Sequence, residues 1–149
     1  MKITELIQES SIKLTLNSKD KPSVIRELVK VLEAQNLITD YEEIVAEVEK
    51  RETHSSTGIG FGIAIPHVKS PFVKTPSLVF GRSENGIDYE SMDDEKAHIF
   101  FLIAVPDGGV DLHLKALATL SRKLVDDEFR EDLMKATTKA SILALLDTI

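Results

Sequence analysis

Apolar residues recur every three or four positions over two segments in the first third of the chain. This period predicts one helix over about 22–36 and a second over about 41–52. Pro22 suits a first helical turn, where the N–H that proline lacks would have no partner in any case. Asp40 precedes the second segment and has Glu43 three residues later, a pattern typical of a helix start.

Other segments indicate strands. Strict alternation of apolar and polar residues predicts a half-buried strand over 12–16, after a short helix over 2–8. Residues 78–81 have the composition of a short strand, and the Asn-Gly pair at 85–86 is typical of a hairpin turn. The run 98–105 is apolar throughout, which predicts a central strand that is buried on both faces of a sheet.

The C-terminal third has a helical pattern. One apolar stripe predicts a helix that His113 opens, with these members: Leu114, Leu117, Ala118, Ser121, Leu124 and Val125. A short helix follows around 129–134, and Thr138 is suited to cap a last helix that runs to Ile149. Because strands and helices are mixed and one strand is buried on both faces, we expect a layered α/β fold.

Length and charge limit the number of domains and the classes of partner that the chain can have. Its 149 residues fit one domain over 1–149. The 18 Lys and Arg against 25 Asp and Glu give a net charge of −7, which argues against nucleic acid or an anionic membrane as the main partner. No apolar run approaches the ~20 residues that cross a bilayer, and no signal-peptide core is visible. We therefore expect a cytoplasmic protein without direct membrane insertion.

The residue types present narrow the chemistry further. The chain has no cysteine, which excludes thiol nucleophiles and thiolate zinc sites, and it has four histidines, at 54, 67, 98 and 113. Their spacing matches no metal-binding motif, so we expect no metal and no other cofactor. His54 lies in a polar stretch and is predicted to be exposed. His98 begins the apolar run and is predicted to be a hydrogen-bonded residue at a strand end.

Gly58, Gly60 and Gly62 alternate in an apolar segment that ends at His67. Their spacing is not Gly-x-Gly-x-x-Gly, and no Lys-Ser or Lys-Thr pair follows, so we reject a nucleotide-binding loop. Close backbone packing or positive φ explains the glycines instead. Pro66 fixes the backbone before His67. That histidine is either a nucleophile, because a neutral imidazole keeps a nucleophilic ring nitrogen at cell pH, or a hydrogen-bonded structural residue.

His113 and Arg51 also allow two interpretations each. At a helix N-terminus, His113 either stays neutral where anions are attracted or is merely an exposed residue of the first turn. Arg51, near the end of the second predicted helix, either offers a forked guanidinium to phosphate or only complements the helix dipole. Composition and spacing leave these alternatives open.

Three motifs together are more specific than each one alone: Arg-Glu at 51–52, Ser-Thr-Gly-Ile-Gly at 56–60 and Gly-Ile-Ala-Ile-Pro-His at 62–67. They resemble the enzyme IIA (EIIA) domains of the bacterial phosphoenolpyruvate-dependent sugar phosphotransferase system, in the fructose, mannitol and nitrogen-regulatory family. Gly-Arg-Ser at 81–83 and the apolar run 99–105 agree with this resemblance, which covers nearly the whole chain. Within the family, the chain looks most similar to the fructose-specific domains.

The resemblance implies a phosphotransferase component with a mixed sheet that is flanked by helices on both faces. It implies that His67 accepts a phosphoryl group on its tele nitrogen and that His113 and Arg51 stabilise this group. Ser56 and Thr57 would add hydrogen-bond donors or contact a partner. No metal is implied, because the donor is already an activated phosphoramidate.

The resemblance also implies two protein partners. Phospho-HPr would donate the phosphoryl group, and the EIIB component of a permease for fructose or a related sugar would receive it. The alternative is a nitrogen-type regulatory EIIA, whose phosphorylation state controls other proteins. Phe61 replaces a polar residue of fructose-type relatives, and we expect its ring to enlarge an apolar docking surface around His67. The sequence names no sugar and does not decide between a monomer and a weak homo-oligomer.

Overall fold

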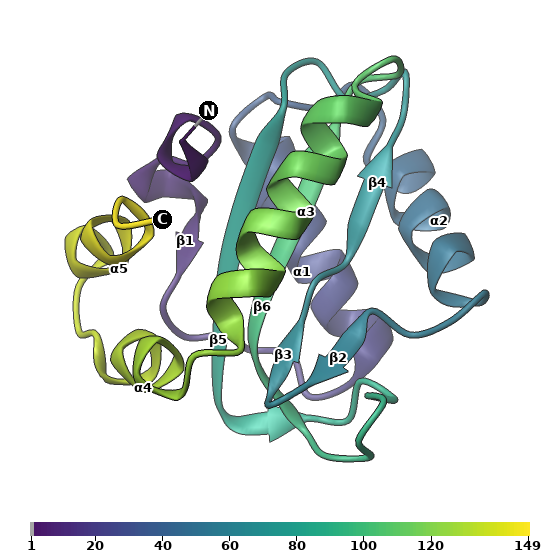
Figure 1. Cartoon of the computed structure of the whole chain (residues 1–149). Coiled ribbons are helices and arrows are strands. Elements are labelled where there is room, and N and C mark those ends of the chain that lie inside the picture. The colour runs from purple at the N-terminus through teal and green to yellow at the C-terminus, as the bar shows by residue number, and fades with distance from the viewer. Residues whose placement is uncertain (1) are drawn as a thin grey trace.

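A computed structural model describes residues 2–149, and its centre is a mixed β-sheet (Figure 1). The strands are β1 (Ile12–Lys13), β2 (Gly58–Gly60), β3 (Ile63–Ala64), β4 (His67–Lys69), β5 (Ser77–Ile87) and β6 (Ala97–Val105). They lie in the order β1-β5-β6-β3-β2, and β4 pairs with β6 beyond the end of β3. β5 is antiparallel to β6, whereas β3 and β4 are parallel to it.

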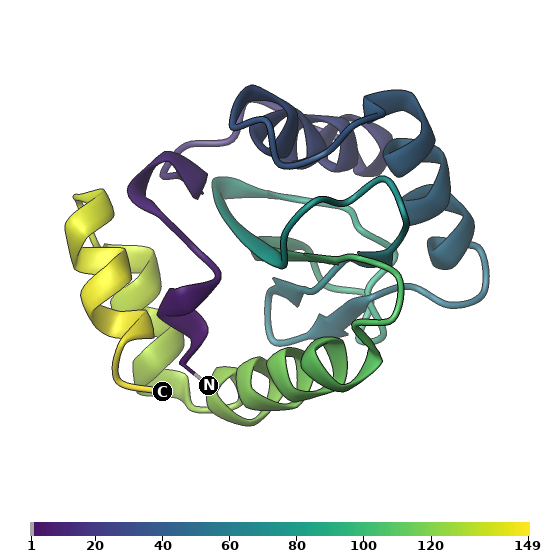
Figure 2. The same ribbon diagram turned by 90° about the horizontal axis from the view of Figure 1, so that it is seen from above.

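Helices cover both faces of this sheet (Figure 2). They are α1 (Lys21–Ala34), α2 (Tyr41–Glu52), α3 (Val110–Leu124), α4 (Asp127–Lys135) and α5 (Lys139–Leu146). The first two pack on one face, and the other three pack on the opposite face with the N-terminal segment. The predicted α/β class, a mixed sheet flanked by helices on both faces, is confirmed.

β6 is the centre of both cores. Phe100, Leu102 and Ala104 are buried under α1 and α2, while Phe101 and Ile103 are buried under α3. The prediction of a strand that is buried on both faces is therefore confirmed. Packing on both faces holds β6 rigidly, and the shorter strands β3 and β4 take their positions by pairing with it.

The helix boundaries agree closely with the periodicity. Asp20 caps α1 by accepting the Ser23 N–H, and Asp40 caps α2 by accepting the Glu43 N–H at 3.1 Å. Thr138 caps α5 as predicted. Among residues 2–149, no helix is both long enough and apolar enough to cross a membrane.

The N-terminal prediction is wrong in detail. In place of a helix over 2–8, the chain makes a 3₁₀ turn at Ile3–Glu5 and a second at Glu9–Ser11. Gln8 and Ser11 cap the second turn reciprocally, and this local bonding competes with a continuous helix. The strand predicted over 12–16 pairs regularly with β5 only at Ile12–Lys13.

The predicted hairpin at 85–86 is also wrong, because both residues lie inside β5. The pairing of β5 with β6 jumps from Arg82 opposite Ile99 to Ile87 opposite Ala97, so the Asn-Gly pair lies in a bulge. Gly86 has φ of +83° there, a conformation that glycine adopts without strain. Gly86 thus has the positive φ that an Asn-Gly turn uses, but the chain does not reverse its direction there.

α3 begins at Val110, four residues ahead of the predicted stripe, so His113 lies in its first turn without opening the helix. The buried ridge is Ala116, Leu120 and Leu124. Leu114 and Val125, both predicted to face the core, are 55% and 57% exposed. The ridge at i+4 spacing packs on the sheet with Leu117 beside it, whereas Leu114, Ala118 and Val125 face away from the core.

Candidate functional site

His67 is the first residue of β4 and lies at a bend that β6 holds in place. The Pro66 carbonyl accepts the N–H of Ile103, and His67 is paired with that same residue in the parallel register. The Nδ1 atom of His67 lies 2.9 Å from the Ile65 carbonyl oxygen. Because a carbonyl can only accept, Nδ1 carries the proton in this bond. The Nε2 atom is therefore left with a lone pair.

The ring of His113 lies beside the ring of His67. Their centroids are 4.8 Å apart, with an angle of 45° between the planes. His113 Nε2 is buried and has no hydrogen-bond partner within residues 2–149. A buried polar nitrogen without a hydrogen bond costs free energy. A group that enters the site and bonds to this nitrogen would remove that cost.

Both imidazoles favour the neutral form. Burial lowers the pKa of His67 below its ordinary value, and the nearby Arg51 charge lowers it further, although the bond to Ile65 opposes this. Burial is also the main cause that lowers the pKa of His113, followed by the charges of His67, Lys69 and Arg51. At neutral pH the site holds two uncharged rings beside one fixed cation.

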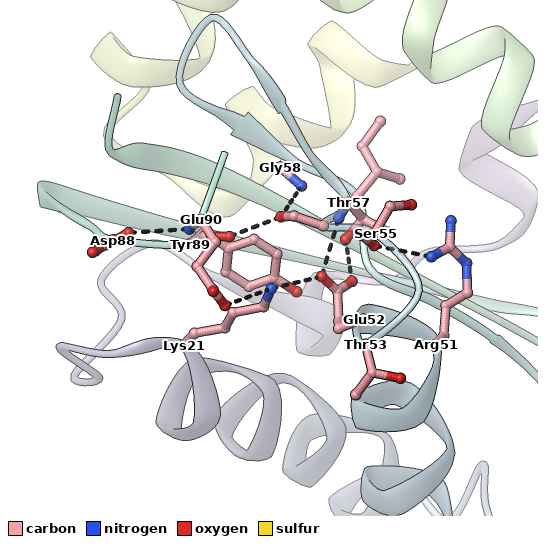
Figure 3. Close-up of polar contacts among 12 residues, drawn as sticks. Lys21, Arg51, Glu52, Thr53, Ser55, Thr57, Gly58, Asp88, Tyr89 and Glu90 are labelled. Atoms are coloured by element: carbon pink, nitrogen blue, oxygen red, sulfur yellow. Dashed lines mark hydrogen bonds and ion pairs between the residues drawn. The ribbon is translucent and has the colours of Figure 1, made fainter. Parts of the chain in front are cut away.

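Arg51 supplies that cation from the last turn of α2 (Figure 3). Its Nη1 donates to the Ser55 carbonyl at 3.0 Å, which anchors one side of the guanidinium. A guanidinium has five N–H donors, so the remaining ones can face an anion. The structure thus brings His67, His113 and Arg51 together from three elements that are distant in the sequence.

Ser56 and Thr57 are occupied with other bonds. The Ser56 hydroxyl donates to the Tyr89 carbonyl at 2.8 Å and accepts the Gly58 N–H. Thr57 is buried, and its hydroxyl donates to the Glu52 carboxylate. A buried threonine is not part of a docking surface, so the expectation that Thr57 contacts a partner is wrong for this conformation.

Phe61 lies away from His67. It is 59% exposed at the β2–β3 turn, where its φ is +59°. Because β3 meets β6 at Ile99 and His67 meets it at Ile103, four residues, or about 13 Å, separate the two levels along β6. The ring instead packs 4.9 Å from the Arg130 guanidinium and lines a pocket of about 390 Å³. The expectation that Phe61 enlarges a surface around His67 is therefore wrong.

The other two histidines have the predicted surroundings. His54 is exposed. His98 is half-buried, and its Nδ1 lies 3.0 Å from the Ser83 carbonyl, which closes the β5 bulge. Sequence reasoning missed Glu52 and Lys21, whose charged groups meet at 3.0 Å beneath the site. The Arg-Glu motif at 51–52 was the one sequence signal for Glu52, and no signal pointed to Lys21.

Comparisons with known proteins agree with this geometry. The family model described as "Phosphoenolpyruvate-dependent sugar phosphotransferase system, EIIA 2" matches residues 5–149. The chain is 44% identical over 147 residues to the "PTS system fructose-specific EIIABC component" of Bacillus subtilis, covering 99% of this chain and 23% of that protein. The chain thus spans about a quarter of that relative.

Two shorter relatives match along nearly their full length. The "PTS system fructose-like EIIA component" of Escherichia coli is 33% identical, with 93% of both chains covered. The crystal structure of the nitrogen regulatory protein IIA-Ntr from Neisseria meningitidis has a TM-score of 0.91 at 27% identity and covers 97% of this chain and 98% of that chain. With the family model matched over almost all its length, the chain belongs to the EIIA components of the phosphoenolpyruvate-dependent sugar phosphotransferase system, which are phosphotransfer proteins.

Proposed function

We propose that this chain is a cytoplasmic phosphocarrier of a sugar uptake system. His67 accepts a phosphoryl group from phospho-HPr and passes it to an EIIB component. One observation carries the proposal: the bond from Nδ1 to Ile65 leaves Nε2 as the nitrogen of His67 with a lone pair, in a ring whose centroid lies 4.8 Å from that of His113. The fructose-specific and fructose-like names of the relatives support fructose, or a related sugar, as the one transported.

The transfer is an in-line displacement at phosphorus. The His67 Nε2 lone pair forms the new N–P bond while the N–P bond of the donor breaks, and its electron pair returns to the donor ring. The transferring group carries its charge on the equatorial oxygens. Arg51 holds oxygens with its fork, and His113 donates a ring N–H to another. The lowered pKa of His67 favours a deprotonated Nε2 for the attack.

The surface around the site suits brief contacts with protein partners. Val110 and Leu114 are exposed on the turns of α3 that carry His113, and they offer an apolar patch next to the reactive ring. The net charge of −7 attracts a basic-faced carrier such as HPr. Steering by charge together with a small apolar contact gives complexes that form and part quickly.

A regulatory role of the nitrogen type is the second candidate. The structure of the Neisseria IIA-Ntr protein, at a TM-score of 0.91, supports it. The same His67 chemistry serves both roles, so the two differ only in the receiver of the phosphoryl group. The fructose-type names and the name EIIABC, which joins A, B and C components in one protein, favour transport.

Intact-mass analysis tests the proposal. We expect the wild-type chain, incubated with phosphoenolpyruvate, enzyme I and HPr, to gain the mass of one phosphoryl group, and to lose it when a fructose EIIB domain is added. His67→Gln should gain nothing, whereas His54→Gln, at an exposed histidine, should behave as wild type. A wild-type chain that stays unmodified would contradict the proposal. A labelled chain that no EIIB discharges would favour the regulatory role.

A further inference from the structure

A buried carboxylate lies directly beneath the site. Glu52 is the last residue of α2, and its side chain is only 5% exposed. Its Oε1 accepts the Thr57 N–H at 3.0 Å and pairs with Lys21 Nζ at 3.0 Å, while its Oε2 accepts the Thr57 hydroxyl (Figure 3). The aromatic ring of Tyr89, 4.6 Å from Lys21 Nζ, covers the ion pair. Both carboxylate oxygens of Glu52 therefore have partners, and the side chain is almost completely shielded from solvent.

A chain of hydrogen bonds leads from Glu52 to the ring of His67. The carboxylate holds the Thr57 N–H, and the Thr57 carbonyl accepts the Ile65 N–H at 3.0 Å. The Ile65 carbonyl in turn accepts the proton of His67 Nδ1 at 2.9 Å. Each link fixes the next, so the tautomer and orientation of His67 depend on where Thr57 is held.

A second connection leads from the same carboxylate to Arg51. The guanidinium is anchored on the Ser55 carbonyl, which lies in the loop 53–57 between Glu52 and its partner Thr57. Two bonds from Thr57 to Glu52 close this loop into a tight ring. If the bonds between Thr57 and Glu52 were lost, the loop would be free to move. The Ser55 carbonyl, which accepts the Arg51 hydrogen bond, would move with it.

We propose that Glu52 is a positioning residue for phosphoryl transfer, and that Lys21 and Thr57 hold it as the common anchor of His67 and Arg51. The inference rests on the proposed function of His67. Charge-assisted hydrogen bonds are about twice as strong as neutral ones, which explains a carboxylate at this position. Displacing a reacting group by about 1 Å can cost on the order of 100-fold in rate, so a small shift of the loop is enough to slow transfer.

The test uses three variants of the full chain. Glu52→Gln keeps the size and an acceptor for the Thr57 N–H but removes the charge that pairs with Lys21. Thr57→Val removes only the hydroxyl and leaves the ion pair intact, so it probes the same anchor if Glu52→Gln does not fold. Glu43→Gln makes the same change of charge at an exposed position on α2 and is the matched control.

The readouts are the rate of phosphorylation at varied phospho-HPr concentration and the ¹⁵N NMR signals of the His67 imidazole. In Glu52→Gln we expect kcat to fall by about tenfold or more, with KM for phospho-HPr nearly unchanged, since the anchor lies below the docking surface. We also expect the single Nδ1–H tautomer of His67 to give way to a mixture. Thr57→Val should show the same changes to a smaller degree, and Glu43→Gln should match wild type.

Two results would overturn the inference. One is a folded Glu52→Gln that keeps the wild-type kcat. The other is a loss of rate while the His67 imidazole signals stay those of the wild type, which would assign Glu52 to stability alone. The NMR readout needs no partner protein. If the wild-type chain is not phosphorylated at all, the proposed function fails, and the tautomer measurement then shows only whether Glu52 orients the ring of His67.

Discussion

The free lone pair on Nε2 of His67 depends on the two residues that precede it in the chain. Pro66 restricts the backbone before the histidine, and the Ile65 carbonyl accepts a hydrogen bond from Nδ1–H. The resemblance to EIIA domains implied that His67 is the acceptor, but the sequence did not indicate which group binds its Nδ1. Which group faces Nδ1 depends on how residues 57 and 65 pair, and this pairing depends on the fold.

The pKa of His67 gives a pH prediction. We expect its imidazole to titrate with a midpoint below the ordinary value of about 6.5, because burial and Arg51 disfavour the cation. The unfolded chain then binds the proton first as the pH falls. The stability that this histidine contributes is complete above about pH 6.5 and is lost as the pH falls through the lower, folded value. A histidine NMR titration measures this midpoint. A His67 midpoint at or above the ordinary value of about 6.5 would contradict the prediction.

Arg51→Lys separates the shape of the guanidinium from its charge. Lysine keeps the positive charge but cannot bind two phosphoryl oxygens with a planar fork, so we expect phosphorylation by phospho-HPr to slow by about tenfold to 100-fold. The measurement is the initial rate by intact mass. Arg122→Lys, at an exposed position on α3, is the control. Equal rates in Arg51→Lys and wild type would show that charge alone suffices there.

Among the elements, three helices and the central strand β6 could be predicted closely, whereas the short strands could not. The boundaries of α1, α2 and α5 follow local signals, namely the apolar period and a capping side chain. β2, β3 and β4 were not predicted because their pairing with β6 and with one another depends on residues far away in the sequence. The ion pair of Lys21 and Glu52 was missed for the same reason, since it forms only where α1 packs beside α2.

Arg82 ties α4 to the sheet, and its loss gives a prediction at this scale. Its guanidinium donates to the carbonyls of Leu14, Leu133 and Ala136, at 3.0, 2.9 and 2.6 Å. We expect Arg82→Met to lower the free energy of unfolding by about 3 kcal/mol, because partly buried carbonyls lose charged donors. Arg26→Met, at an exposed ion pair on α1, should cost much less, because solvent screens that pair. Urea unfolding compares the two, and equal losses would contradict the role of Arg82.

At the scale of the whole molecule, the site and the exposed Phe61 lie at different levels of the sheet. The parts that meet near His67 are the end of α2, the start of β4 and the first turn of α3. A rigid sheet that is buried on both faces holds them in register. If the proposed function holds, we expect a partner to meet a preformed site and to dock through a small apolar contact and favourable charge.

Leu114 tests this docking surface. It is 55% exposed next to His113, and Val125 is 57% exposed at the far end of the same helix. We expect Leu114→Ser to raise KM for phospho-HPr by about threefold to tenfold with little change in kcat, because truncating a central apolar contact weakens binding. Val125→Ser, the matched control, should leave both constants unchanged. Steady-state phosphorylation kinetics measure them, and equal effects of the two variants would place the docking surface elsewhere.

The ring nitrogen that carries the phosphoryl group decides whether His67 acts through its free Nε2 lone pair. The chain, labelled with ¹⁵N in its histidines, is phosphorylated by phospho-HPr and examined by NMR for coupling between phosphorus and a ring nitrogen. We expect coupling to Nε2 of His67, with the Nδ1 proton still hydrogen-bonded to the Ile65 carbonyl. Coupling to Nδ1 of His67, or to a nitrogen of any other histidine, would contradict it.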